Sequence, residues 1–264
     1  MPIKKDGTGK RWVELEFLTP GTPEQVWQAL ATGPGNTAWF TRAEIEERVG
    51  GSFLLDFGQE ATTRGEVTEW APPQRFCYVE REWEPGAPPV ATEITIVARS
   101  GARCVVRMVH SLFASSDDWD DQLEGFENGW PGFFAVLKVY LSHFAGRPAA
   151  SFVSNIPAKA NSLAAWQRLT EALGLSGANV GERRGWSSGP EACSGIVEHV
   201  HQDAQQRYVL LRLDAPTPGL VLLGAYDKGS TTSLSMCRYF YGEAAAELAA
   251  ASEPRWRDWL ASLC

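Results

Sequence analysis

The hydrophobic positions of this chain follow a period of two over most of its first half. In residues 12–19, Val13, Leu15 and Phe17 alternate with glutamates, which is the pattern of a half-buried β-strand. Similar patterns, separated by short turns, occupy residues 44–49, 53–57, 64–70, 75–83, 90–99 and 102–113. The short turns predict an antiparallel meander, because parallel neighbours would need crossovers of about a dozen residues or more.

Two short helices are predicted between the first and second strands. Residues 22–24, Thr-Pro-Glu, supply a cap, a first-turn proline and an acid, and so predict a helix start. Residues 33–35, Gly-Pro-Gly, are predicted to end this helix. A second short helix is expected to carry Trp39 and Phe40.

Residues 117–146 hold the longest helical pattern. Large apolar residues recur three or four positions apart from Trp119 to Phe144, so they share one side of a helix. Four aspartates at its start are expected to cap its first turn, and Gly146 is expected to end it. Pro131 either begins the main helix after a short acidic turn or kinks a continuous helix.

The alternation also assigns side chains to the two faces of the sheet. Arg103 and Arg107 are expected to face solvent, so every second residue from Cys104 to Leu112 is expected to point inward. The side chains predicted to point inward are Phe53, Leu55, Phe57, Ile94, Ile96, Cys104, Val106, Met108, His110 and Leu112. The long helix is expected to cover this aromatic and aliphatic face.

The order of these elements resembles the START-like helix-grip (SRPBCC) superfamily and, within it, the family named after the activator of Hsp90 ATPase. The stretches that carry the resemblance are residues 22–30 (TPEQVWQAL), 39–40 (WF), 50–53 (GGSF), 65–67 (GEV), 73–76 (PQRF), 129–131 (GWP) and 136–138 (VLK), with Leu141. The resemblance implies an α+β helix-grip fold, in which a curved antiparallel sheet wraps around a long C-terminal helix. It also implies a cavity that binds small apolar or amphipathic molecules, without a shared catalytic triad. The founding co-chaperone has a separate chaperone-binding domain, which no stretch here resembles.

The second half of the chain reads as a shortened copy of the first. Residues 65–70 are echoed by residues 195–200, and residues 74–79 by residues 206–211. The second copy has too few residues before Gly195 for the early hairpin of the first half, and its final helix is shorter than that of the first half. We therefore predict two domains, a helix-grip domain over residues 1–147 and a truncated helix-grip-like repeat over residues 148–264. The repeat is expected to cover a sheet edge or to replace the partner of a homodimer.

Composition limits the possible partners. The 264 residues carry a formal net charge of −8, with a pI near 5.1, which argues against a nucleic-acid or anionic-membrane surface. Five scattered cysteines include no C-x-x-C pair, which favours a reducing cytoplasm over a disulfide framework or a zinc site. No apolar run of about 18 residues is present, and no apolar segment follows the first lysines, so we expect a chain that is neither membrane-spanning nor secreted.

The predicted function is the binding of a small hydrophobic or amphipathic molecule, without catalysis and without a cofactor or metal. The residues predicted to line its site are Trp39, Phe53, Leu55, Phe57, Tyr78, Ile94, Ile96, Val106, Met108, His110, Trp130, Phe134 and Leu137. One alternative is a cyclase or hydrolase with His110 as base and Tyr78 as donor. Another is a chaperone-linked interaction protein, an analogy with the family name. His199 and His201 share a strand face as a metal pair would, but no third ligand is evident.

Overall fold

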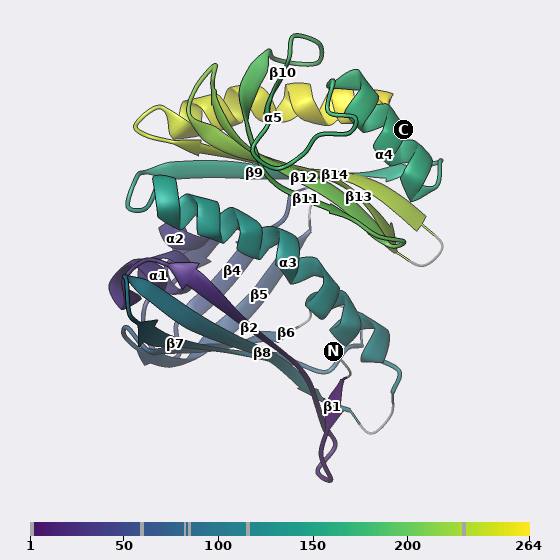
Figure 1. Cartoon of the computed structure of the whole chain (residues 1–264). Helices are drawn as coiled ribbons and strands as arrows, with labels where there is room; N and C mark the ends of the chain where they lie inside the picture. Colours follow the sequence, from purple (N-terminus) through teal and green to yellow (C-terminus); the bar gives the residue numbers. More distant parts are fainter. Residues whose placement is uncertain (1–2, 59–60, 82, 84–85, 115–116, 229–230) are drawn as a thin grey trace. The chain divides into compact units, whose positions relative to one another are not determined.

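A computed structural model of the chain describes residues 3–58, 61–81, 83, 86–114, 117–228 and 231–264, without the side chains of residues 126, 127 and 228. The chain divides into two compact units. The first unit comprises residues 1–56 and 60–146, and the second comprises residues 57–59 and 147–264. The fold class is α+β, with one antiparallel sheet in each unit, which is consistent with two helix-grip-like domains (Figure 1).

The first sheet has eight strands in the order β1-β2-β8-β7-β6-β5-β4-β3. Their bounds are β1 Lys4–Lys5, β2 Lys10–Pro20, β3 Arg42–Ile45, β4 Ser52–Asp56, β5 Thr62–Ala71, β6 Arg75–Arg81, β7 Val90–Arg99 and β8 Arg103–Phe113. All pairs are antiparallel, and the run from β3 to β8 confirms the predicted meander. The first long strand, β2, pairs with the last, β8.

The first helix confirms its predicted start, whereas the second differs from the prediction. Helix α1 (Pro23–Ala31) is capped by Thr22 in a capping box. Helix α1 ends just before Gly-Pro-Gly, as predicted. This segment then begins α2 (Gly33–Thr37), which the Thr32 hydroxyl caps, so the predicted position of the second helix over Trp39 and Phe40 is wrong. A Cβ atom on Gly35 would lie 1.7 Å from the Gln28 carbonyl oxygen, so glycine permits this close packing. Trp39 and Phe40 follow the helix.

Helix α3 (Asp120–His143) is continuous through Pro131, which settles the alternative left open by the sequence. It lies along the sheet of the first unit (Figure 1) and contacts β2 and β8. The predicted side-chain cap is wrong, since Trp119 occupies the cap position without such a bond. Asp120 instead forms an ion pair with the buried Arg11 of β2, which anchors the start of the helix to the sheet.

Burial follows the predicted alternation with one exception. Inward-facing residues of β8 from Cys104 to Leu112 are at most 1% exposed, and their counterparts on β4 and β7 are also buried. Phe57 is the exception. It lies beyond the end of β4, is half-buried and belongs to the second unit, and the next residue, Gly58, has a φ of +74°. The prediction that Phe57 lines the inner face is therefore wrong.

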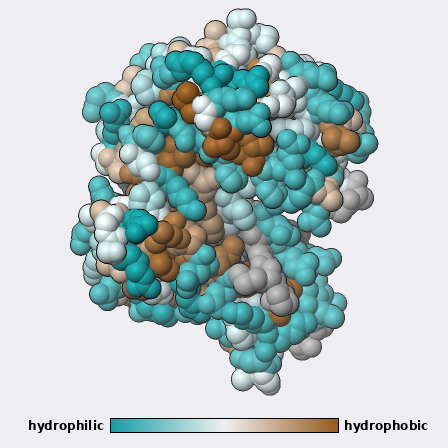
Figure 2. All heavy atoms as spheres, in the orientation of Figure 1, coloured by the Kyte–Doolittle hydropathy of each residue, from teal (hydrophilic) through white to brown (hydrophobic). Residues whose placement is uncertain are grey.

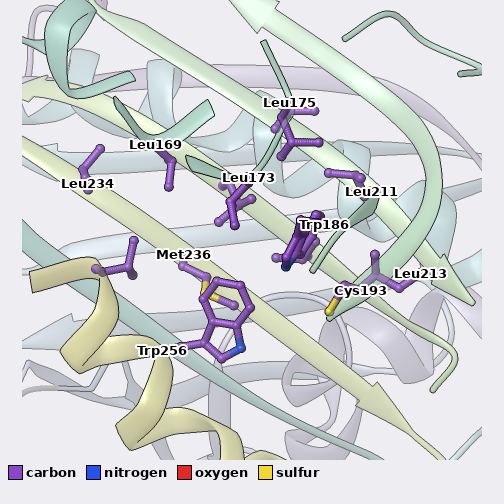
Figure 3. Close-up of a cluster of buried hydrophobic side chains, with 14 of the residues drawn as sticks. Leu169, Leu173, Leu175, Trp186, Cys193, Leu211, Leu213, Leu234, Met236 and Trp256 are labelled. Atoms are coloured by element: carbon purple, nitrogen blue, oxygen red, sulfur yellow. The ribbon is translucent and has the colours of Figure 1, made fainter. Parts of the chain in front are cut away.

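The second unit has a six-stranded sheet in the order β10-β11-β12-β13-β14-β9. Its elements are β9 Ala149–Ala158, α4 Ser162–Ala172, β10 Arg183–Trp186, β11 Cys193–Gln202, β12 Gln206–Ala215, β13 Gly219–Lys228, β14 Thr231–Tyr241 and α5 Ala245–Ser262. This order repeats that of the first sheet from β2 to β4, without counterparts of α2 and β3 in the described chain. Side chains from the sheet, α4 and α5 form its apolar core (Figure 3).

Hydrophilic residues cover most of the face seen in Figure 2. Among the described residues, large exposed hydrophobic side chains such as Val49, Phe113 and Val180 are far apart in the sequence. No helix in the described ranges is both long enough and apolar enough to cross a bilayer.

Candidate functional site

A row of polar side chains crosses the inner face of the first sheet. Tyr78 of β6 lies opposite Thr92 of β7, and Thr92 lies opposite His110 of β8. The period of two turns all three toward the same face as the apolar residues of these strands. Each is at most 5% exposed. Hydroxyl and imidazole groups are therefore held inside an otherwise apolar interior.

His110 is held in one protonation state by its two hydrogen bonds. The indole Nε1–H of Trp130, on α3, donates to His110 Nε2 at 2.7 Å, and His110 Nδ1 lies 2.9 Å from Thr92 Oγ1. Because an indole nitrogen only donates, Nε2 must accept and the proton must lie on Nδ1. Burial lowers the pKa of His110 to about 3, so the ring is neutral at physiological pH. A neutral ring with both nitrogens engaged is poorly suited to the predicted role of base.

Tyr78, at one end of this row, and the neighbouring Glu80 have hydrogen-bonding capacity left over. Burial and the neighbouring Glu80 carboxyl raise the pKa of the Tyr78 phenol, and a hydrogen bond from Thr92 partly opposes the rise. The Tyr78 hydroxyl is therefore protonated and can donate. Glu80, two residues further along β6, is 8% exposed. Within the described chain, its carboxyl group has no hydrogen-bonding or ion-pair partner, and burial alone raises its pKa to about 7.

Tyr78 and Glu80 share a face of β6, about 6 to 7 Å apart along the strand. Sequence reasoning placed Tyr78 in the site but missed Glu80, since a glutamate near the end of a strand is usually solvated. The sequence did indicate that Glu80 points inward, because it lies an even number of residues after Phe76 and Tyr78 and therefore shares their face of the strand. A carboxyl that is half-ionised near pH 7 beside a phenol donor can bind a polar group or exchange a proton with it.

Aromatic rings surround these polar groups. The Phe53 ring stacks on Tyr78 with a centroid separation of 4.0 Å, and Phe76 lies 5.3 Å from Tyr78. On the helix side, Trp130 contacts Phe40 and stacks with Phe134 at 5.3 Å. Such rings bury large apolar areas and favour planar or apolar neighbours. The polar row therefore connects one aromatic group on the sheet to another on α3.

The structure brings twelve of the thirteen predicted lining residues into the buried interior of the first unit, and Phe57 is the exception. The buried residues are Trp39, Phe53, Leu55, Tyr78, Ile94, Ile96, Val106, Met108, His110, Trp130, Phe134 and Leu137. Their burial leaves ligand contact a prediction. Trp39 has a structural role in addition, because its indole N–H donates to the Ala29 carbonyl at 2.8 Å.

The histidine pair of the second unit has aromatic and acidic neighbours. His199 and His201 both stack on Tyr208, and His201 Nε2 lies 2.7 Å from Asp203 Oδ2. No group of three or more possible metal ligands occurs among the residues that the structure describes. The cysteines are unpaired thiols.

Comparison with solved structures finds similar structures at low sequence identity. CalU16 from Micromonospora echinospora is 20% identical, with a TM-score of 0.43 over 54% of this chain and 83% of that chain. DynU16, from the dynemicin biosynthetic locus, is 16% identical, with a TM-score of 0.45 over 96% of each chain. The Aha1 dimer from Colwellia psychrerythraea is 20% identical, with a TM-score of 0.42 over 50% of this chain and 96% of that chain.

No curated protein matches this sequence. Residues 20–142 match the family described as Activator of Hsp90 ATPase homolog 1-like protein. This range begins at the end of β2 and ends near the end of α3, so it contains the polar row and the aromatic groups on both sides of it. Residues 20–142 of the chain thus belong to the Activator of Hsp90 ATPase homolog 1-like family.

Proposed function

We propose that the first unit is a helix-grip domain that binds a small, mainly apolar molecule carrying one hydroxyl or amino group. The observation that carries this proposal is the pair formed by Tyr78 and Glu80, two buried polar groups with unused hydrogen-bonding capacity on an aromatic inner face. A buried carboxyl without a partner is costly, and a bound polar group would offset that cost.

The chemistry of the pair suggests the polar group of the ligand. A hydroxyl oxygen can accept the Tyr78 O–H while its own proton is donated to the Glu80 carboxylate, so one ligand group satisfies both residues. An ammonium group would donate to the carboxylate and lie against aromatic rings such as Phe53, which favour cations. A ligand carboxylate would place like charges together and is disfavoured.

His110 is assigned a positioning role in this proposal. Its ring connects Trp130 on α3 to Thr92 on the sheet through one hydrogen bond at each nitrogen. Thr92 in turn hydrogen-bonds Tyr78 and leaves the phenol proton for the ligand. The helix therefore orients the donor on the sheet without touching the ligand's polar group.

Native mass spectrometry of the freshly purified chain tests the proposal. An extra mass of a few hundred daltons that disappears on denaturation is the expected result, and its formula would contain a hydroxyl or amino group. A bare chain that also fails to bind a panel of aromatic and aliphatic alcohols and amines would overturn the proposal. That result would favour the alternative in which the chain is a chaperone-linked interaction protein.

Variants locate the site. Glu80→Gln and Tyr78→Phe should each weaken binding of an alcohol or amine found in that panel by about tenfold, the worth of one hydrogen bond to a charged or buried group. Glu66→Gln is the matched control, because it makes the same chemical change at an exposed position on the neighbouring strand β5. Equal binding by all four proteins would remove Tyr78 and Glu80 from the site.

One observation favours a second candidate, acid–base catalysis. The pKa of Glu80 is raised to about 7, where a carboxyl group can both take and return a proton. Glu80 would then replace His110 as the base of a cyclase or hydrolase, with Tyr78 as donor. Turnover of the bound molecule with a pH dependence centred near 7, abolished in Glu80→Gln, would favour this function over binding alone.

A further inference from the structure

The second unit contains a buried charge at the position that His110 holds in the first. His110 and Arg238 are each the eighth residue of the last strand of their sheet. Each also pairs with an inward-facing residue of the preceding strand, Thr92 for His110 and Val221 for Arg238. Arg238 has 0% exposure, so a guanidinium group is enclosed within the apolar core.

The guanidinium of Arg238 is only partly satisfied. Nη1 donates to the carbonyl oxygens of Leu220 at 3.2 Å and Tyr239 at 3.1 Å. Nε and Nη2 are buried and have no hydrogen-bond acceptor among the described residues. These two adjacent nitrogens present parallel N–H bonds, the fork that fits both oxygens of a carboxylate. The unused donors are therefore arranged for one kind of ligand group.

The nearest acid does not complete this fork. Glu191, in the segment between β10 and β11, places Oε1 3.7 Å from Arg238 Nε, which is an ion pair but longer than a hydrogen bond. The same Oε1 accepts the Trp256 indole N–H at 2.8 Å, which holds the carboxylate in that position. Arginine keeps its charge even where burial lowers its pKa, so the fork stays cationic.

Apart from Glu191, apolar side chains lie near the fork. The Phe240 ring lies 4.2 Å from the Arg238 guanidinium carbon. Cys193, Trp186 and Trp256 are buried in the same core, and Figure 3 shows their side chains close to one another. A small inorganic anion would gain little from these neighbours, whereas the hydrocarbon part of an organic acid would be buried against them.

We propose that the second unit binds a small carboxylate with an apolar body, whose two oxygens bond Nε and Nη2 of Arg238. Glu191 lies at the edge of this site and competes electrostatically with the ligand carboxylate. The site is independent of the first-unit site and has the opposite charge preference. The chain therefore has one site for a neutral or cationic molecule and another for an anion.

Calorimetric titration of the full chain with octanoate tests this proposal, with octanol as the uncharged control. Wild type should bind octanoate at least about tenfold more tightly than octanol, because charge-assisted bidentate bonds are the difference between them. Arg238→Met should lose that preference. Equal binding of both probes by wild type would overturn the proposal.

Arg238→Met is a suitable variant because replacing a buried charge by an apolar side chain of similar volume is often tolerated. If it does not fold, Arg238→Lys keeps the charge without the fork and should weaken octanoate binding by about tenfold. The control is Arg212→Met, which removes an arginine paired with Glu198 at a partly exposed position. Unchanged octanoate binding in either Arg238 variant would overturn the proposal.

The Glu191→Gln variant tests whether a ligand carboxylate or Glu191 itself occupies the fork of Arg238. Its amide oxygen can still accept the Trp256 N–H, but its negative charge is gone, so octanoate should bind severalfold more tightly. Weaker binding would mean that Glu191 itself completes the fork, and would overturn the proposal. Octanoate binding lost in Glu80→Gln but retained in Arg238→Met would place the carboxylate in the first unit, with the same consequence.

Discussion

Replacing the buried Glu80 by glutamine should change the pH dependence of stability in a direction fixed by its environment. Burial raises the pKa of Glu80 from 4.5 to about 7 in the folded protein. Between these values the folded state binds more protons than the unfolded state, so stability falls as pH rises. This rise in the pKa of Glu80 corresponds to about 3 kcal/mol of folding stability, which is lost by pH 8.

Glutamine cannot ionise, so Glu80→Gln should escape this loss. The free energy of unfolding of the variant, minus that of wild type, should therefore grow by about 3 kcal/mol between pH 4.5 and pH 8. His110 acts in the opposite direction, because its pKa is lowered to about 3 and stability rises with pH from about 3 to 6.5. This contribution is common to both proteins and cancels in the difference.

Urea unfolding followed by tryptophan fluorescence at pH 4.5, 6 and 8 measures this difference. Glu66→Gln, at an exposed position, controls for the loss of one formal charge. A difference that stays constant across the three pH values would refute the reasoning, because it would mean that Glu80 titrates as a solvated carboxyl does. A titration of the Glu80 carboxyl carbon by NMR would give the pKa directly.

Two further predictions concern packing. His110→Leu should destabilise the chain by about 1 to 3 kcal/mol, because it leaves the Trp130 indole N–H without its acceptor, and it should alter ligand selectivity; an unchanged binding profile would remove His110 from the site. Gly35→Ala should lower the thermal midpoint, since its Cβ would overlap the Gln28 carbonyl, whereas Gly129→Ala, with open space in α3, should leave it unchanged or raise it. Equal midpoints for the two glycine variants would contradict the packing at Gly35.

Much of the fold followed from periodicity, and the exceptions have physical causes. The period of two placed Met108 and His110 inward correctly, because a strand with one buried face fixes the direction of every side chain. It could not place Phe57, since the end of a strand depends on the turn that follows. A second short helix was predicted, but it was placed around Trp39 because Gly-Pro-Gly usually ends helices. Helix α2 instead begins at Gly33 and packs closely on α1.

The candidate site was only partly predictable. Its apolar lining and His110 followed from alternation. The lack of a partner for Glu80 among the described residues depends on which side chains meet across the interior, and a single sequence does not record that. The internal echo had a similar limit. The repeat seen in the sequence aligned Tyr78 with Leu210. When the two sheets are matched by strand pairing instead, His110 corresponds to Arg238 and Tyr78 corresponds to Leu211. A shift of one residue exchanges the two faces of a strand.

The shared strand order of the two sheets has a consequence for how the protein could diversify. When a scaffold is present twice in one polypeptide, one copy can keep an ancestral specificity while the other accumulates substitutions at equivalent positions. His110 and Arg238 occupy one such pair of equivalent positions. The His110 side chain is neutral, whereas the Arg238 side chain is permanently charged. Translation of a single chain also fixes the stoichiometry of the two units at one to one, so the two proposed binding sites would always be present in equal number.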